Sequence, residues 1–544
     1  MNSDRSRAIC LNTLIVFLLC LIYITLLRKA HIYVYDEGEI IAPTLRIARG
    51  QVIYRDFFTF RPPGSHYLMA LIYWLSGFKN TVTETVIILN LALTATFTFA
   101  LGRMLLGSTL WAFFPALFFL TYGPYNWFLL SPHWFSALCL LISIYFLLRH
   151  YHGERRLLYL MISGAFTGSA ILMLHPPGML FWCFVILLQS IDGIITSQKI
   201  KTILRDIMTF SSAVLLPIIP FAIYLFLNGA IHDAVYDTVI WVMENYSKMG
   251  RYPEYFYPGK LLLREALTKF GILKGLFQTG WVLMLGYAPL LTYILSPLVI
   301  IKLYKTDRAS AGLLIFYYFT GLSIFLSSLY RSDITHLLFQ IPVTMILFFY
   351  LIRFSIAYCL ASKLFFTRLA GIIPVFAIIL CLPYLFYNFI IVQYTLHTAN
   401  IIKVHTPAGG FYIRDGQKSA ELWNNLFAAL HGVRDKEIFV YAHAPNLYFD
   451  LGVINPTRYD YAMTGQFTEK QRMEIIQSLE KSKPEFVVYD RIIERILSNP
   501  AMAGYPMTDL ETIKKDRVRE YIFSNYRPLP DFILSGLIIM RRIE

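Results

Sequence analysis

A single stretch decides the fold class: Ile207-Met-Thr-Phe-Ser-Ser-Ala-Val-Leu-Leu-Pro-Ile-Ile-Pro-Phe-Ala-Ile-Tyr-Leu-Phe-Leu227, which contains no charged residue. A helix needs about 20 apolar residues to cross the hydrocarbon core of a bilayer, which is about 30 Å thick. A strand of a membrane barrel needs only about ten. An apolar run of this length therefore predicts a transmembrane helix and argues against a barrel.

The composition agrees with a membrane protein. Of the 544 residues, 57% are hydrophobic and 15% are charged, whereas about a quarter of a typical soluble chain is charged. Lys and Arg number 48 against 34 Asp and Glu, so the net charge is +14. Because the basic residues lie mostly between apolar spans, we attribute the excess to membrane topology. We expect membrane lipids, and no nucleic acid, as partners.

Comparable apolar runs recur throughout residues 1–391. An odd number of spans places the two termini on opposite sides of the membrane, and basic residues gather in alternate connections on the side of Arg5 and Arg7. Short cytoplasmic loops collect Lys and Arg, so we expect a multi-pass protein of the inner (plasma) membrane with a cytoplasmic N-terminus. The eleven predicted spans are roughly 11–27, 82–102, 107–122, 133–148, 157–174, 177–195, 207–227, 279–301, 310–329, 336–352 and 369–391.

Three polar segments are predicted on the outer side: the loops 28–81 and 228–278, and the tail 392–544. The charges of the tail nearly balance, as in a soluble domain. Short apolar runs in it predict strands, and amphipathic runs predict helices, which together indicate an extracytoplasmic α/β domain. The predicted strands are 437–442, 484–489 and 536–540, and the predicted helices are 417–430 and 468–481.

The first outer loop carries most of the residues suited to chemistry. Its acids Asp36, Glu37 and Glu39 closely follow the first span. Neighbouring acids oppose each other's ionisation unless a cation, base or water is near, so the cluster indicates either a site or an ordinary solvated loop. Arg side chains of the same loop suit phosphate binding or interfacial anchoring. These arginines are Arg46, Arg49, Arg55 and Arg61.

Further polar residues approach the membrane from the same side. They are His133, His175, Arg331, Asp333 and His336, all in outer connections. A single interfacial His is more often a hydrogen-bonding residue than a catalyst. Their convergence on one face predicts one site that accepts both an anion and a hydroxyl nucleophile. We expect no metal or other cofactor, although the acids of this face suit Mg²⁺ or Mn²⁺.

Three stretches of the first outer loop carry a resemblance to a known class of enzymes: Tyr35-Asp-Glu-Gly38, Gly50-Gln-Val-Ile-Tyr-Arg-Asp56 and Phe60-Arg-Pro-Pro-Gly64. Together with the segment 331–342, they resemble the polytopic glycosyltransferases of the GT-C class. Among these, the sequence is closest to the bacterial relatives of protein O-mannosyltransferases and of the lipid A aminoarabinose transferase.

The resemblance implies transfer of a sugar from a polyprenyl-phosphate donor to an acceptor hydroxyl on the extracytoplasmic face, with inversion at the anomeric carbon. It implies that Asp36 is the general base, with Glu37 as the neighbour that binds acceptor or tunes the base. Arg61 and His336 match positions that contact the donor phosphate, and His336 is flanked by Arg331 and Asp333. Further candidates for substrate binding are Glu39, Arg55, His133 and His175.

Two other functions fit the same sequence. A transporter or flippase of lipid-linked sugars also needs many spans, but transporters usually show repeats and charges at the membrane midplane, whereas these polar residues gather at one face. A scaffold protein would keep the fold without the chemistry. The sequence does not choose among a glycan, a lipid and a protein of the cell envelope as acceptor.

Overall fold

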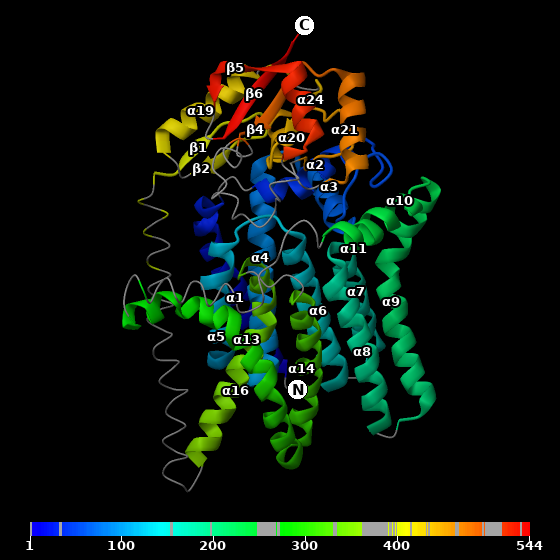
Figure 1. The fold of residues 1–544 in the computed structure, drawn as a ribbon. Coiled ribbons are helices and arrows are strands. Elements are labelled where there is room, and N and C mark those ends of the chain that lie inside the picture. Colours follow the sequence, from blue (N-terminus) through cyan, green and yellow to red (C-terminus); the bar gives the residue numbers. More distant parts are fainter. Residues whose placement is uncertain are drawn as a thin grey trace.

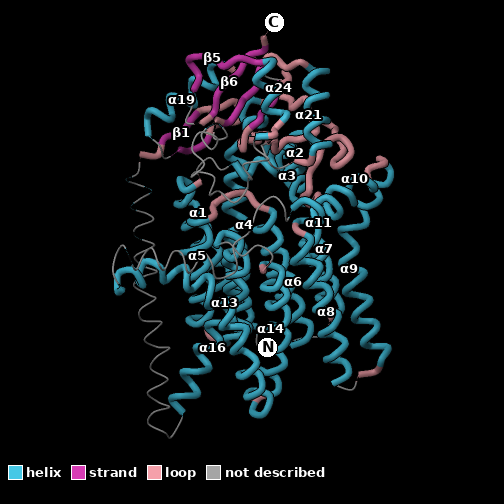
Figure 2. The backbone as a smooth tube through the Cα atoms, viewed as in Figure 1, coloured by secondary structure: helices cyan, strands magenta, loops and turns pink. Residues whose placement is uncertain are grey.

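The structure is a computed structural model in which the chain forms a bundle of long helices with a small α/β domain at one end (Figure 1). Among the described residues, the strands lie in that domain (Figure 2). The structure describes residues 3–31, 35–152, 156–195, 198–246, 268, 272–329, 334–361, 390, 394, 396, 398, 400–413, 416–430, 432–433, 436–462, 467–491, 494, 514–533 and 536–543.

Ten of the predicted spans overlap long helices of the bundle. Eight of these helices are long and apolar enough to cross a membrane, and α5 and α7 complete the ten. The eleventh predicted span, 369–391, lies almost entirely outside the described residues, so the count of eleven stays a prediction. The helices are α1 (Ser3–Leu26), α4 (Asn80–Leu106), α5 (Thr109–Asn126), α6 (Pro132–His152), α7 (Leu157–Met173), α8 (His175–Ile195), α9 (Ile200–Leu227), α13 (Ile272–Thr306), α14 (Arg308–Ser328) and α16 (Ile341–Ala361).

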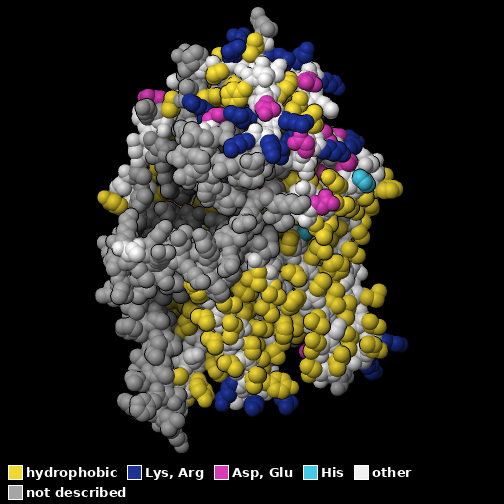
Figure 3. Space-filling model, in the orientation of Figure 1, with side chains coloured by type: hydrophobic (Ala, Val, Ile, Leu, Met, Phe, Trp, Pro, Cys, Tyr) yellow, Lys and Arg dark blue, Asp and Glu magenta, His cyan; other side chains and the backbone are white. Residues whose placement is uncertain are grey.

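The outward faces of the helices are apolar. Large side chains such as Leu216, Phe226 and Leu227 of α9 are exposed. Figure 3 shows hydrophobic side chains over the described part of the bundle on this face, with Lys and Arg side chains at the end far from the domain and mixed charges over the domain. Water would disfavour so large an apolar surface, and the hydrocarbon core of a membrane accommodates it.

Inside the bundle, small residues let helices approach closely. The hydroxyl of Ser143 in α6 lies 2.9 Å from that of Ser163 and 2.8 Å from that of Thr167 in α7. A Cβ atom on Gly168 would lie 2.0 Å from the backbone oxygen of Val214 in α9. Close packing and hydroxyl pairs of this kind hold helices together where no water drives their association.

The outer loops form short helices between the bundle and the domain. In the first loop, α2 (Gly38–Ala48) and α3 (Gly64–Ser76) lie directly under the domain (Figure 1). In the second loop, α10, η3 and α11 form one continuous helical segment with a π-helical turn in its middle. The remaining short helices are η1 (Leu27–Ala30), η2 (Tyr35–Glu37), α10 (Ile231–Val235), η3 (Tyr236–Ile240), α11 (Trp241–Asn245), α15 (Ile334–Leu337) and η5 (Leu338–Gln340).

The domain contains a four-stranded sheet in the order β3-β4-β6-β5, in which β3 and β4 are parallel and the other neighbours antiparallel. A separate antiparallel pair is formed by β1 and β2. The three predicted strands and two predicted helices match β3, β4, β6, α19 and α21. The elements are β1 (Ile402–Val404), β2 (Phe411–Ile413), α19 (Gly416–Ala429), β3 (Ile438–Tyr441), α20 (Asn446–Leu451), α21 (Glu469–Ser482), β4 (Phe486–Asp490), α24 (Arg517–Asn525), β5 (Tyr526–Ile533) and β6 (Leu537–Arg542).

Helices cover both faces of this sheet. Val440 and Val488 pack in the core that includes α19, whereas Phe439 and Val487 pack in the core that includes α21 and α24. All four residues of β3 are buried, as expected for a parallel strand with both faces covered. This is why the sequence shows continuous apolar runs here instead of alternation.

Buried polar contacts join the first outer loop to the domain. Arg46 Nε lies 2.8 Å from Asp460 Oδ1, and both side chains are buried. The Arg46 guanidinium also donates to the backbone oxygen of Thr457. The backbone N–H of Phe58 donates to the oxygen of Arg458 at 2.8 Å. The boundary that we predict at 391/392 falls among residues that are mostly outside the described part, so it stays a prediction.

The same interface leaves no room at Gly38, the first residue of α2. A Cβ atom there would lie 2.3 Å from Asn446 Oδ1 and 2.3 Å from the side chain of Pro445 in the domain. Nearby, the Asn80 amide donates to Asp450 Oδ1 at 2.9 Å. The domain therefore sits directly on the segment that carries the acidic cluster.

Candidate active site

A polar cleft lies between the outer end of the bundle and the domain. Its volume is about 930 Å³, including its opening to solvent. Its walls come from the first outer loop, the connection between α5 and α6, the α15 region and the domain. It is lined by Asp36, Glu39, Ile40, Phe60, Arg61, Trp127, Leu129, Leu130, Ser131, Pro132, His133, Tyr246, His336, Phe339, His443 and Tyr461.

Asp36 meets the domain inside this cleft. Its Oδ1 lies 3.0 Å from Nε2 of His443, and the Asp36 side chain is 43% exposed. His443 follows β3, and its ring packs edge-on against Tyr461 at 4.7 Å between centroids. The carboxylate thus contacts a side chain of the domain and is still open to a substrate, which is the arrangement that a general base needs.

Glu37 occupies a different environment from its neighbour. It is buried, does not line the cleft, and accepts from the backbone N–H of Leu130 at 2.6 Å. Its two oxygens lie 2.9 and 3.0 Å from His31 Nε2, and His31 Nδ1 lies 3.7 Å from Glu84. Burial lowers the pKa of His31, but the two carboxylates raise it more, to about 10. A charged His31 therefore balances Glu37, and this network ties the loop to the cleft wall at Leu130.

Arg61 and Glu39 form an ion pair on the wall of the cleft. Arg61 Nε and Nη2 donate to Glu39 Oε2 at 2.9 and 2.7 Å. The guanidinium also lies over the ring of Phe60, 4.8 Å from its centroid. A partly buried Arg held in this way presents a fixed positive charge to an anion in the cleft.

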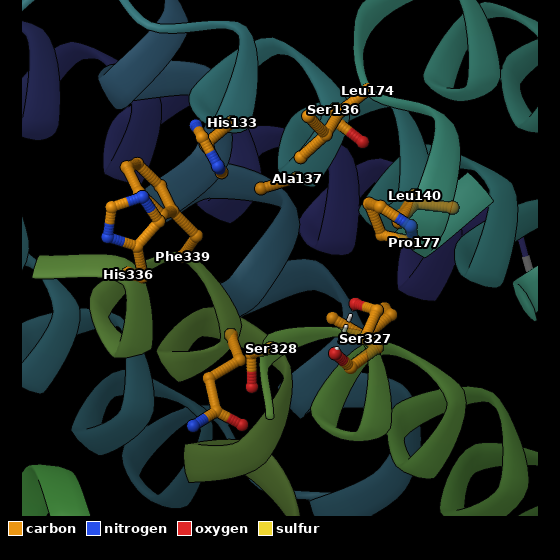
Figure 4. A pocket seen from close by; sticks show the side chains of 12 residues that line it. His133, Ser136, Ala137, Leu140, Leu174, Pro177, Ser327, Ser328, His336 and Phe339 are labelled. Atoms are coloured by element: carbon orange, nitrogen blue, oxygen red, sulfur yellow. Dashed lines mark hydrogen bonds between the residues drawn. The ribbon is translucent and has the colours of Figure 1, made fainter. Parts of the chain in front are cut away.

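His133 and His336 stand where the polar cleft meets an apolar cavity of about 460 Å³. The two rings are 5.0 Å apart and nearly perpendicular, and Phe339 stacks on His133 at 4.6 Å. In Figure 4 these three side chains lie on one side of the cavity, with Leu140 and Pro177 on the opposite side. The cavity runs between α6, α8 and α14 and is lined mostly by carbon.

Two other predicted site residues, His175 and Arg55, do not line the cleft. His175 begins α8 next to Leu174, which lines the apolar cavity. Arg55 is exposed and pairs with Asp56 at 2.8 Å. Arg331 and Asp333 lie outside the described residues, so their roles stay predictions.

In the described part of the chain, no group of three or more His, Cys, Asp or Glu side chains is arranged to hold a metal ion. The expectation that the protein works without a metal stays a prediction.

Sequence reasoning missed the domain's contribution to the cleft. His443 and Tyr461 come from the domain, and Tyr246 comes from the second outer loop. One signal was present: His443 immediately follows the predicted strand 437–442, and loops at the carboxyl ends of parallel strands commonly build sites.

The second outer loop contributes a buried acid close to the cleft. Asp237 lies in the π-helical turn η3, and such turns are frequent at functional sites. Burial raises the pKa of Asp237 to about 8, although Arg458 and the backbone N–H of Thr59 lower it. The nearby acids Asp233 and Glu474 add to the rise.

The fold and the cleft define a class of protein: a polytopic membrane protein whose outer α/β domain closes over a polar site at the end of the bundle. No protein-family model matches the sequence, and no curated protein sequence matches it. The arrangement itself, however, is found in solved structures.

ArnT from Cupriavidus metallidurans in the apo state superposes with a TM-score of 0.55 at 12% identity, covering 99% of each chain. The structure of ArnT bound to undecaprenyl phosphate gives a TM-score of 0.53 at 12% identity, covering 100% of this chain and 99% of that chain. An oligosaccharyltransferase from Archaeoglobus fulgidus, in complex with Zn and sulfate, gives 0.50 at 13% identity, covering 92% and 70%.

At these identities the likeness establishes the fold. The chain has the same fold as ArnT, that of a polytopic helical membrane protein with a C-terminal domain, as the sequence predicts. Because nearly all of both chains is covered, the likeness includes the outer domain as well as the bundle.

The buried acid predicts a pH dependence of stability. Unfolded Asp loses its proton near pH 4, whereas native Asp237 keeps it to about pH 8, so the native state binds more protons across this window. Stability should therefore fall as pH rises from about 4 to about 8, by up to roughly 1.4 kcal/mol per pH unit from this group. The unfolding temperature of detergent-purified Asp237→Asn, compared with wild type at several pH values, measures this. Parallel pH profiles would contradict the assignment.

Proposed function

We propose that this protein is a glycosyltransferase that moves a sugar from a polyprenyl-phosphate donor to an acceptor hydroxyl on the extracytoplasmic face. The observation that carries the proposal is one cleft with two kinds of group: a solvent-accessible carboxylate, Asp36, and the cationic or hydrogen-bonding side chains Arg61 and His336. The cleft opens into an apolar cavity within the bundle. The ArnT of the same fold is bound to undecaprenyl phosphate, which supports a lipid-linked donor.

The chemistry is a single displacement at the anomeric carbon. The acceptor oxygen attacks that carbon while Asp36 takes its proton, and the bond from the sugar to the phosphate oxygen breaks. The electron pair of that bond leaves with polyprenyl phosphate. Arg61 and His336 stabilise the phosphate as its charge grows, which is where fixed cations lower a barrier most. Attack from the face opposite the leaving group inverts the configuration.

The apolar cavity explains why the donor is a lipid. Its walls are helices of the bundle, and its polar end is formed by His133 and His336. An isoprenoid tail in this cavity places its phosphate at the two histidines, within the cleft that contains Arg61. We place the protein in the inner (plasma) membrane with a cytoplasmic N-terminus, because the basic connections lie at the end of the bundle far from the domain (Figure 3).

The transporter alternative is less well supported by the same geometry. A transporter usually places its binding groups near the membrane midplane, between repeated halves. Here the described acids, arginines and histidines of the cleft all lie at the outer end of the bundle, against the domain.

The general-base assignment predicts the effect of one isosteric change. Asp36→Asn keeps the size and a hydrogen-bonding oxygen but removes the base, so turnover should fall at least about a hundredfold. Release of polyprenyl phosphate in nanodiscs measures this, with a panel of polyprenyl-phosphate sugars and a cell-envelope extract. Asp56→Asn, outside the cleft and paired with Arg55, is the matched control. Wild-type turnover in Asp36→Asn would remove the assignment.

The phosphate assignment predicts a change in donor binding. Hydrogen bonds to charged groups contribute about 1.5–3 kcal/mol, so Arg61→Ala should raise the KM for the donor about ten- to a hundredfold. The control is Arg55→Ala, because Arg55 is exposed and does not line the cleft. The assignment fails if Arg61→Ala keeps the donor affinity of wild type.

The contact between His443 and Asp36 predicts a positioning effect from the domain. His443→Ala should lower turnover about tenfold, because the carboxylate loses the group that orients it. His443→Gln places an N–H donor in a similar position and should restore part of the loss, whereas a purely structural defect would not respond to it. Equal turnover in all three proteins would argue against a positioning role.

A further inference from the structure

A second pocket adjoins the polar cleft on the side of the domain. We call it the aromatic pocket; its volume is about 460 Å³, including open space at its mouth. It shares Glu39, Phe60, Arg61 and Tyr461 with the cleft, so the two spaces adjoin each other. It is lined by Glu39, Pro43, Phe58, Thr59, Phe60, Arg61, Trp241, Tyr459, Asp460, Tyr461 and Phe467.

The aromatic residues that line the pocket also pack against one another. Phe58 packs edge-on against Trp241 at 5.0 Å and lies 5.6 Å from Tyr459, while Phe60 stacks on Trp241 at 5.6 Å. Trp241 is buried, and its indole N–H donates to Gln471 of the domain at 3.1 Å. Three separate segments of the chain thus meet to form fixed ring faces around one space.

Asp460, one of the lining residues, has a buried oxygen without a partner among the described residues. Asp460 is buried, and its Oδ1 accepts from Arg46 at 2.8 Å and from Asn455 at 3.0 Å. Its Oδ2 is also buried and has no hydrogen-bond partner among the described residues. Leaving a buried carboxylate oxygen without a donor is costly, so this atom indicates a ligand that supplies one.

We infer that the aromatic pocket is a carbohydrate subsite for the acceptor, in which a sugar ring packs on the aromatic faces and one of its hydroxyls donates to Asp460 Oδ2. A pyranose has both parts: a C–H face that packs on aromatic rings and an edge of hydroxyl donors. A purely apolar group, such as a lipid chain, would leave the carboxylate oxygen unsatisfied. This inference rests on the proposed function and narrows its acceptor to a glycan.

The order of the three spaces assigns the pocket to the acceptor. The apolar cavity meets the cleft at His133 and His336, and the aromatic pocket meets it at Glu39 and Tyr461. A lipid-linked donor therefore enters from the membrane side and brings its anomeric carbon into the cleft beside Asp36. The acceptor reaches the same carboxylate from the domain side, through the aromatic pocket.

Saturation-transfer NMR on the full chain in nanodiscs tests this inference. The probes are methyl glycosides of hexoses and N-acetylhexosamines, with N-acetyltyrosinamide as the peptide probe. With the wild-type protein, saturation should be transferred to the ring protons of at least one glycoside. Asp460→Asn replaces a carboxylate oxygen, which accepts hydrogen bonds, by an NH2 group, which donates them, with little change in side-chain volume. This change should weaken glycoside binding about tenfold. Asp450→Asn, a buried acid of the same domain outside the pocket, should not.

Phe58→Leu provides a second variant that does not touch the Arg46 contact. It removes one ring face and should weaken glycoside binding about fivefold. The inference is overturned if no glycoside binds wild type, if Asp460→Asn and Phe58→Leu bind as tightly as wild type, or if only N-acetyltyrosinamide binds. Displacement of the glycoside by a polyprenyl-phosphate sugar would assign the pocket to the donor instead.

Donor binding, measured separately with the same nanodiscs, distinguishes the two levels of the argument. If the protein consumes the lipid-linked donor but binds no glycoside, the proposed function stands and the proposed subsite is wrong. If the protein neither binds nor consumes any donor, the proposed function is wrong, whether or not a glycoside binds.

Discussion

The buried ion pair between Arg46 and Asp460 is the constraint on which the cleft depends. It joins helix α2, which directly follows the turn that carries Asp36, to the domain that supplies His443. Breaking a buried pair from one side leaves an uncompensated charge, which typically costs about 3–5 kcal/mol. Together with the hydrogen bonds of Phe58 to Arg458 and of Asn80 to Asp450, it fixes the domain over the loop, so that Asp36 and His443, 407 positions apart, come within 3.0 Å.

Two adjacent acids take different roles because of the turn that contains them. Asp36 and Glu37 lie in the 3-10 turn η2, where three residues complete a turn and consecutive side chains point about 120° apart. One carboxylate therefore faces the cleft while the other turns into the protein, against His31 and the backbone of Leu130. The two carboxylates have separate histidine partners: Asp36 lies 3.0 Å from Nε2 of His443, and Glu37 lies 2.9 Å from Nε2 of His31.

The helices and strands could be predicted from the sequence, but the contacts between residues far apart in the chain could not. Long apolar runs and buried strands leave a local signal, so ten predicted spans overlap helices of the structure, and the runs 437–442 and 484–489 match neighbouring parallel strands. Local patterns also marked Asp36, Arg61, His133 and His336. They did not distinguish Glu37 from Asp36, because burial decides that difference, and they did not reveal His443, because its partner is distant in the chain.

The positions of the apolar cavity, the polar cleft and the aromatic pocket follow from the residues that line each of them. Helices that face lipid can offer a mostly apolar cavity, because polar groups within a membrane are costly. Charged groups are tolerated at the two ends of the bundle, where water reaches them, and the acids, arginines and histidines of the cleft lie at the outer end. The domain adds aromatic and acidic side chains at this end, as Tyr459, Asp460 and Tyr461 show. Under the proposed function, helices of the bundle line the space for the lipid-linked donor, whereas the first outer loop and the domain together line the space for the acceptor.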